Sequence, residues 1–245
     1  MEDKLLDHVS WTSQDFLGRP IRGIILRFGG LGNMDMRAGG GDPMELEWSE
    51  LGGLVVQPFH EPWAWMNPST QRFVDELIDA LLVRHQLPAS TPIIATGGSM
   101  GGHGALVYSR YSRHRVTACL ALWPVCDALF HYSERVDLPR TMHHAFGSYG
   151  NIEPALLRHS PLHLADQMPD IPYLIVHGAQ DKAVSKSSHS DKFVAAMRVL
   201  GRRIEYVEVA NLGHGGPMDY RTYRRIVDFV AAMLTAADEK CRVPS

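Results

Sequence analysis

The sequence is poor in the features that mark membrane, disulfide-stabilised and nucleic-acid-binding proteins. It has three cysteines among 245 residues, none of them in a CxxC spacing. No apolar run approaches the about 20 residues that a membrane helix needs, and acidic residues stand where a secretory signal would carry basic ones. Lysine plus arginine (24) do not outnumber aspartate plus glutamate (27), so charge-driven binding to nucleic acid is not expected. These absences predict a cytoplasmic protein with no disulfide framework, no membrane partner and no nucleic-acid partner.

Short apolar runs alternate with helix-period segments along most of the chain. The runs are apolar at consecutive positions, as strands buried on both faces of a parallel sheet require. They cover residues 24–26, 54–56, 93–96, 116–122, 171–176 and 204–209. This alternation predicts one α/β domain over residues 1–245, built on a doubly wound and mostly parallel sheet. Glu205 and Glu208 interrupt the last run and place it near an edge of the sheet.

One segment, at about residues 125–165, breaks this alternation. It has no clean period, but it is rich in aromatic residues and histidine, which argues against disorder. Ligands of open α/β sheets bind beyond the carboxyl ends of the strands. We therefore predict that the segment forms a small cap insertion over that edge of the sheet.

The strongest chemical signal is GGSMGG at residues 97–102, between an apolar run and a segment that can be helical. A serine flanked by small residues at such a junction is typical of a nucleophile elbow, a tight turn that presents the hydroxyl of Ser99 above the sheet. Gly97 and Gly101 are needed because a Cβ at either position would collide with a neighbouring element. The same turn aims the N–H of Met100 at the point where negative charge would develop. A glycine-rich turn that binds phosphate is the alternative interpretation.

Two further residues follow later runs in an informative order. Asp181 comes after the run 171–176, and His214 comes after the run 204–209. Nucleophile, acid, histidine is the chain order of the α/β-hydrolase triad, and the carboxyl ends of parallel strands lie at one edge of a sheet. His214 would take the proton from Ser99, and Asp181 would orient its imidazole. Asp127 also follows a predicted strand and is the alternative acid.

These residues carry a resemblance to the α/β-hydrolases. The segments GGSMGGHGAL (residues 97–106) and HGAQD (residues 177–181) are similar to the esterase D-like and prolyl-oligopeptidase-like branches, and the resemblance extends over about residues 20–237. It implies an α/β-hydrolase fold and a second oxyanion donor on the loop after the first parallel strand. Gly30 is the first candidate for that donor and Leu31 the second, and Leu31 is also a candidate substrate contact.

The position of Phe28 separates the two branches. Esterase branches often have histidine there, whereas prolyl-oligopeptidase-like peptidases have a tyrosine whose hydroxyl helps to hold the oxyanion. Phe28 has no hydroxyl. The resemblance therefore favours an esterase whose oxyanion hole consists of two backbone N–H groups.

Three tryptophans follow the carboxyl ends of predicted strands and are candidate substrate contacts. Trp63, Trp65 and Trp123 could form an aromatic wall for an acyl or aryl group, or they could pack as core beneath the cap. Thirteen histidines raise the question of a metal, but their spacings match no metal-binding motif. We expect neither a metal nor a cofactor, because water is the second substrate of a serine hydrolase.

Together these patterns predict a serine hydrolase that cleaves small-molecule carboxylic esters through an acyl-enzyme. Two alternatives remain open at this stage. One is a peptidase or amidase that acts on short peptides, and the other is a non-catalytic ligand-binding protein with the same fold.

Overall fold

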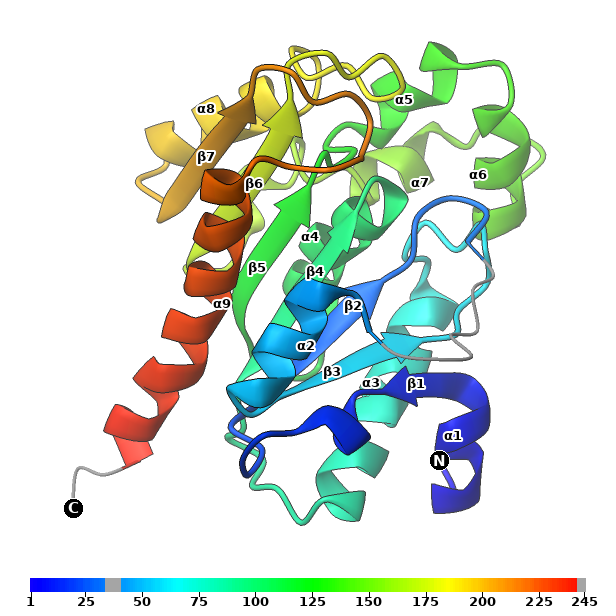
Figure 1. Ribbon diagram of the computed structural model, residues 1–245. Coiled ribbons are helices and arrows are strands. Elements are labelled where there is room, and N and C mark those ends of the chain that lie inside the picture. The colour runs from blue at the N-terminus through cyan, green and yellow to red at the C-terminus, as the bar shows by residue number, and fades with distance from the viewer. Residues whose placement is uncertain (34–40, 242–245) are drawn as a thin grey trace.

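A seven-stranded sheet lies at the centre of the computed structural model, which describes residues 1–33 and 41–241 (Figure 1). Its order within these residues is β1-β3-β2-β4-β5-β6-β7, and only β1 runs antiparallel to its neighbour. The strands are β1 (Ser10–Thr12), β2 (Gly23–Phe28), β3 (Gly53–Pro58), β4 (Ile93–Gly98), β5 (Val116–Leu122), β6 (Tyr173–Gly178) and β7 (Ile204–Val209). The six predicted strands are confirmed, and β7 is an edge strand as its glutamates indicated.

Helices cover both faces of the sheet, which confirms the doubly wound α/β architecture. The helices on the two faces are α2 (Pro43–Glu50), α3 (Pro68–Arg84), α4 (Met100–Tyr111), α8 (Ser190–Val199) and α9 (Tyr220–Cys241). Neighbouring strand residues contribute to opposite cores, since Ile24 belongs to the cluster that contains α3, α4 and α8, whereas Ile25 belongs to the cluster that contains α2 and α9. Both side chains are fully buried. Consecutive apolar positions were therefore the correct sign of a sheet covered on both sides.

The remaining helices are short. Four lie near the amino terminus or before β6, namely η1 (Asp3–Leu5), α1 (Leu6–Val9), η2 (Gln14–Phe16) and η3 (Ala165–Gln167). In the described ranges, no helix is both long enough and apolar enough to cross a membrane.

The segment predicted as a cap forms three helices, α5 (Ala128–Glu134), α6 (Leu138–Phe146) and α7 (Glu153–Arg158). They lie at the end of the sheet to which the central strands point (Figure 1). Leu138, Met142 and Leu156 of these helices form an apolar cluster with Met100 of α4. This cluster connects the inserted helices to the start of the helix that follows Ser99.

Candidate active site

Ser99 stands on a strained turn between β4 and α4. Its backbone has φ 59° and ψ −124°, in the region with positive φ that costs a residue with a Cβ about 1–3 kcal/mol. The surrounding backbone holds this conformation, because the Ser99 N–H donates to the Leu122 carbonyl (3.0 Å) and the His103 N–H donates to the Ser99 carbonyl (3.0 Å). Such a turn presents the serine hydroxyl above the carboxyl end of the sheet.

The glycines on either side of Ser99 are required for close approach. A Cβ on Gly97 would lie 2.5 Å from the carbonyl carbon of Gly101, and a Cβ on Gly101 would overlap the carbonyl oxygen of Phe28. These are backbone atoms that cannot move aside without displacing β2 or α4. The steric requirement predicted from the sequence is confirmed.

Ser99, His214 and Asp181 form one line of hydrogen bonds. The distance from His214 Nε2 to Ser99 Oγ is 2.9 Å, and the distance from His214 Nδ1 to Asp181 Oδ2 is 2.8 Å. Because Nδ1 faces a carboxylate it carries the ring proton, so Nε2 accepts from the serine hydroxyl. The side chain of Asp181 is fully buried, whereas that of His214 is 28% exposed. The three side chains come from the loops after β4, β6 and β7, where the sequence placed them.

Asp181 is held as a carboxylate. Its Oδ1 accepts from the N–H groups of Ala183 (2.9 Å) and Val184 (3.0 Å), while Oδ2 faces both His214 and His177. Burial opposes ionisation, but the hydrogen bonds from the two histidines and the two N–H groups outweigh it and hold the pKa of Asp181 below its ordinary value. An ionised acid in this place orients the imidazole and stabilises its charged form.

The alternative acid, Asp127, has a different role. Its carboxylate accepts from the Phe130 N–H (3.0 Å) and caps the start of α5, and His163 lies 3.3 Å away. His214 Nδ1–H donates to Asp181 instead. Asp127 is therefore a helix cap rather than the partner of His214.

Both predicted oxyanion donors lie on segments next to Ser99. Met100 is the first residue of α4, so its N–H belongs to the turn that a helix leaves without an intrahelical acceptor. Gly30 follows β2, and a Cβ built on it would lie 3.8 Å from the Gly98 carbonyl oxygen. The loop that carries Gly30 therefore runs alongside the elbow. Their role as donors stays a prediction.

Leu31 and Trp63 lie together where the main domain meets α6. The Gly32 N–H donates to the Pro62 carbonyl (2.9 Å), which joins the loop after β2 to the loop after β3. Leu31 is half-buried against the apolar cluster of the inserted helices. Trp63 is also half-buried, and the guanidinium of Arg140 lies 4.9 Å from the centre of its ring. Both residues keep exposed surface for a ligand.

Trp123 lies beside the triad. Its ring centre is 6.4 Å from that of His214, and its indole packs against Gly98 and Gly215. It has a positive φ of 36° and is half-buried. Of the three predicted tryptophan contacts, it is the one whose ring lies beside His214.

The predicted substrate contact of Trp65 is corrected by the structure. Trp65 is 1% exposed, its Nε1–H donates to Thr141 Oγ1 (2.9 Å), and its ring packs against His103 and His131. An indole enclosed in this way cannot line a surface that a ligand reaches. The core interpretation applies to Trp65, because α6 covers it, and no local pattern in the sequence shows that covering.

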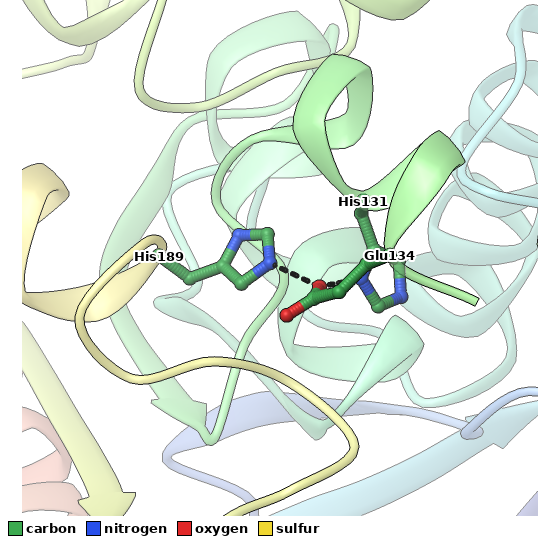
Figure 2. Close-up of side chains that lie close together, drawn as sticks. All are labelled: His131, Glu134 and His189. Atoms are coloured by element: carbon green, nitrogen blue, oxygen red, sulfur yellow. Dashed lines mark hydrogen bonds and ion pairs between the residues drawn. The ribbon is translucent and has the colours of Figure 1, made fainter.

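A second group of titratable residues lies on α5 and the segment before α8, and no sequence pattern predicted that they would meet. Glu134 Oε2 is 2.6 Å from His131 Nδ1 and 2.9 Å from His189 Nε2, so that the carboxylate sits between the two imidazoles (Figure 2). All three ligand-type atoms lie within 4.8 Å of one another. His189 is distant in sequence from the other two, which is why spacing gave no signal.

The donor set of this group does not suit a metal. His189 Nδ1 accepts from the N–H groups of Cys126 (3.2 Å) and Asp127 (3.1 Å), so the ring proton must be on Nε2. That proton is donated to Glu134, and a cation at Nε2 would need the lone pair that the proton occupies. The arrangement is instead a satisfied hydrogen-bond network between α5 and the segment before α8.

Comparison with known families agrees with this geometry. Residues 70–237 match the model of the prolyl oligopeptidase family, a span that exceeds half of the chain and includes Ser99, Asp181 and His214. The chain belongs to the prolyl oligopeptidase family. No curated protein matches the sequence.

Solved structures with the same fold include both peptidases and esterases. Dipeptidyl peptidase 4 of Porphyromonas gingivalis superposes with a TM-score of 0.69 at 19% identity, over 90% of this chain and 33% of that chain. A truncated carbohydrate esterase from gut microbiota gives 0.71 at 18% identity, over 92% and 96%. An S-formylglutathione hydrolase from Agrobacterium tumefaciens gives 0.61 at 21%, over 90% and 84%.

These comparisons indicate the general class of enzyme to which this member of the family belongs. The chain spans about a third of the dipeptidyl peptidase but almost the full length of the truncated esterase. At these identities the structural likeness shows the fold alone, whereas the family match extends over the residues of the triad. The protein is thus an α/β-hydrolase of the serine hydrolase type.

Proposed function

We propose that the protein hydrolyses carboxylic esters of small molecules through an acyl-enzyme formed on Ser99. The observation that carries this proposal is the line of hydrogen bonds from Asp181 through His214 to Ser99, at 2.8 and 2.9 Å. It ends on a hydroxyl held at a strained turn, with the N–H of Met100 at the start of the following helix.

In the first half of the reaction, Ser99 Oγ attacks the ester carbonyl carbon while its proton passes to His214 Nε2. The carbonyl oxygen becomes an oxyanion, which the N–H groups of Gly30 and Met100 would stabilise. When the intermediate collapses, the bond to the alkoxy oxygen breaks and His214 returns the proton to that oxygen. An alcohol leaves, and the acyl group remains on Ser99.

In the second half, water replaces the alcohol. His214 accepts a proton from the attacking water, the same N–H groups hold the second oxyanion, and the proton goes back to Ser99 Oγ as the acid is released. Asp181 stays ionised throughout, since its pKa lies below the ordinary value. The enzyme therefore ends in its starting protonation state.

Preference for esters over amides is supported by Phe28. Its side chain is fully buried, and its ring packs against Tyr108 with the centres 5.6 Å apart. A phenylalanine offers no hydroxyl to the oxyanion, so the hole would depend on two backbone donors. Esters have the better leaving group and need less stabilisation of this kind than amides. The carbohydrate esterase that matches over 92% of this chain supports the same choice.

A peptidase acting on short peptides is the second candidate. The family match and the dipeptidyl peptidase neighbour favour it. An aryl ester and an anilide with the same acyl group separate the two candidates. Hydrolysis of the ester alone is expected, and efficient cleavage of the anilide would favour the peptidase.

The experiment that tests the proposal is intact-mass analysis after treatment with an alkyl fluorophosphonate. We expect one adduct on the wild type and none on Ser99→Ala. Ser133→Ala is the matched control, because Ser133 is an exposed serine on α5 whose hydroxyl bonds only to the Phe130 carbonyl among the described residues. No adduct on folded wild-type protein would overturn the proposal and favour a non-catalytic ligand-binding protein.

A further inference from the structure

A second histidine contacts the carboxylate that orients His214. His177 lies in β6, four residues before Asp181, and is fully buried. Its Nε2 is 3.1 Å from the Val184 carbonyl oxygen and 3.2 Å from Asp181 Oδ2. Its Nδ1 is 2.7 Å from the hydroxyl oxygen of Ser190, the first residue of α8. The proposed reaction gives His177 no step.

The neighbours of His177 determine which nitrogen carries the proton. Nε2 faces two oxygens that can only accept, so it must be the N–H donor, shared between Val184 and Asp181. Nδ1 then accepts from the Ser190 hydroxyl, which is free to rotate toward it. A ring with the opposite tautomer would direct a lone pair at a carboxylate and a carbonyl in a fully buried place. The structure therefore holds His177 in one tautomer.

We propose that His177 is a positioning residue for the hydrolytic reaction and that it acts through Asp181. This inference rests on the proposed function. The hydrogen bonds run from Ser190 through His177 to Asp181 Oδ2, the same oxygen that accepts from His214. His177 does not touch the substrate, but it determines where the carboxylate lies and how much negative charge it presents to His214.

Two consequences follow from this arrangement. The bond to the Val184 carbonyl holds the turn whose N–H groups bind Asp181 Oδ1, so the carboxylate is constrained at both oxygens. The contact at Oδ2 also divides the attraction of the carboxylate between two imidazole N–H donors. Without His177 more of that attraction would act on His214, the imidazolium would be favoured, and the neutral base would be available only at higher pH.

Among the described residues, the other titratable groups beside this line keep one charge state near pH 7. Asp191 of α8 accepts from Tyr206 and is paired at 2.7 Å with Lys186, which also lies 2.7 Å from Glu208. Burial opposes both charges, but these bonds lower the pKa of Asp191 and raise that of Lys186, so both stay charged. The thiol of Cys126 interacts with Ser190, and burial raises its pKa well above the ordinary value, so it stays uncharged. The expected pH effect therefore arises from Asp181 and its two histidines.

The test compares His177→Leu with His177→Gln in the full chain. The amide nitrogen of glutamine can replace the Nε2 donor, whereas leucine cannot. The readout is the second-order rate of fluorophosphonate labelling at Ser99 as a function of pH. For the leucine variant we expect about tenfold slower labelling near pH 7 and an acidic limb moved up by about half a unit, the scale of a hydrogen bond to a charged group. The glutamine variant should restore the rate to within about threefold and the limb to its wild-type position.

Three results would overturn the inference. Folded leucine and glutamine variants could both label like the wild type, they could be slowed equally, or both could slow with no movement of the acidic limb. If the leucine variant does not fold, Ser190→Ala tests the same line, because it removes the hydroxyl that selects the tautomer. Slower labelling with a limb moved in the same direction would then support the inference, and an unchanged profile would contradict it. Failure of the proposed function gives a different result, because the wild type itself would then not be labelled.

Discussion

Two carboxylates in this molecule are each held between two histidines. The carboxylate of Asp181 contacts the imidazoles of His177 and His214, and that of Glu134 contacts the imidazoles of His131 and His189. The contacts span similar distances, 2.8 and 3.2 Å at Asp181 and 2.6 and 2.9 Å at Glu134. The residue types in the two groups are thus almost the same. Among the described residues, however, only the histidines at Asp181 contact a serine hydroxyl.

The two groups differ in the exposure of their histidines and in what the outer nitrogens of His214 and His189 face. At Asp181, the outer nitrogen of His214 faces the hydroxyl of Ser99, and the ring is 28% exposed. At Glu134, the side chains of His131 and His189 are 3% and 0% exposed, and the outer nitrogen of His189 accepts backbone N–H groups. The second nitrogen of His177 also faces a serine hydroxyl, that of Ser190, but His177 is fully buried. We therefore expect acid–base chemistry only at His214, whose second nitrogen faces a hydroxyl in a partly exposed place.

The Glu134 group has a structural consequence instead. Glu134 Oε1 accepts from the Ser185 N–H (2.9 Å), so the carboxylate ties α5 to the loop that follows Asp181. Burial opposes its ionisation, but the bonds from His131, His189 and Ser185 lower the pKa of Glu134 to about 2. Burial lowers the pKa of His189 to about 4, so this ring is neutral near pH 7.

The most severe loss of activity is expected from a substitution of His214 at the proposed active site. His214→Ala should lower the rate of ester hydrolysis by roughly 10⁴-fold, because neither the serine proton nor the leaving group has a partner without the imidazole. The free energy of unfolding should change by less than about 1 kcal/mol, since the ring is partly exposed. Steady-state kinetics on an aryl ester and urea denaturation measure the two quantities.

His189→Ala should instead lower stability strongly and activity only slightly. It leaves the N–H groups of Cys126 and Asp127 without their acceptor, removes a donor from Glu134 and opens a cavity, so we expect a loss of about 2–4 kcal/mol in the free energy of unfolding. The rate at Ser99 should fall less than about tenfold. A His189→Ala variant with wild-type stability and no activity would contradict a purely structural role for the Glu134 group.

A weaker effect is expected from Glu134 on the dependence of stability on pH. The pKa of Glu134 is depressed, so its contribution is complete above the ordinary value of 4.5 and is lost as the pH falls toward 2. The depressed pKa of His189 acts in the same sense, with stability lost as the pH falls from 6.5 toward 4. Glu134→Gln should therefore be about 1–2 kcal/mol less stable than the wild type at pH 7, and this gap should narrow at pH 3.

Urea denaturation at several pH values tests this expectation. Glu153→Gln is the control, because Glu153 is an exposed residue of α7 and its removal should leave the pH profile unchanged. A gap between wild type and Glu134→Gln that stays constant from pH 7 to pH 3 would show that the charge of Glu134 does not stabilise the fold.

Local patterns were enough to predict most of the sheet and the members of the proposed triad. The six parallel strands contain short apolar runs, which glutamates interrupt in β7, and Ser99, Asp181 and His214 each lie in the loop or turn that follows one of them. The short strand β1 was missed, because its three residues have no period and gain their place by pairing with β3. The residues after Asn33, up to position 40, lie outside the described structure.

The fold class, the elbow at Ser99 and the chain order of its partners could be predicted from local patterns, because each pattern consists of residues that are close together in the chain. The burial of Trp65, the role of Asp127 as a helix cap, and the contacts of His177 and Glu134 became visible in the folded chain alone. Each of these depends on which side chain from a distant element arrives next to it. Hydrogen bonding and burial are properties of that final neighbourhood, and they distinguish the histidine beside Ser99 from the buried histidine beside Asp181 and from the two that hold Glu134.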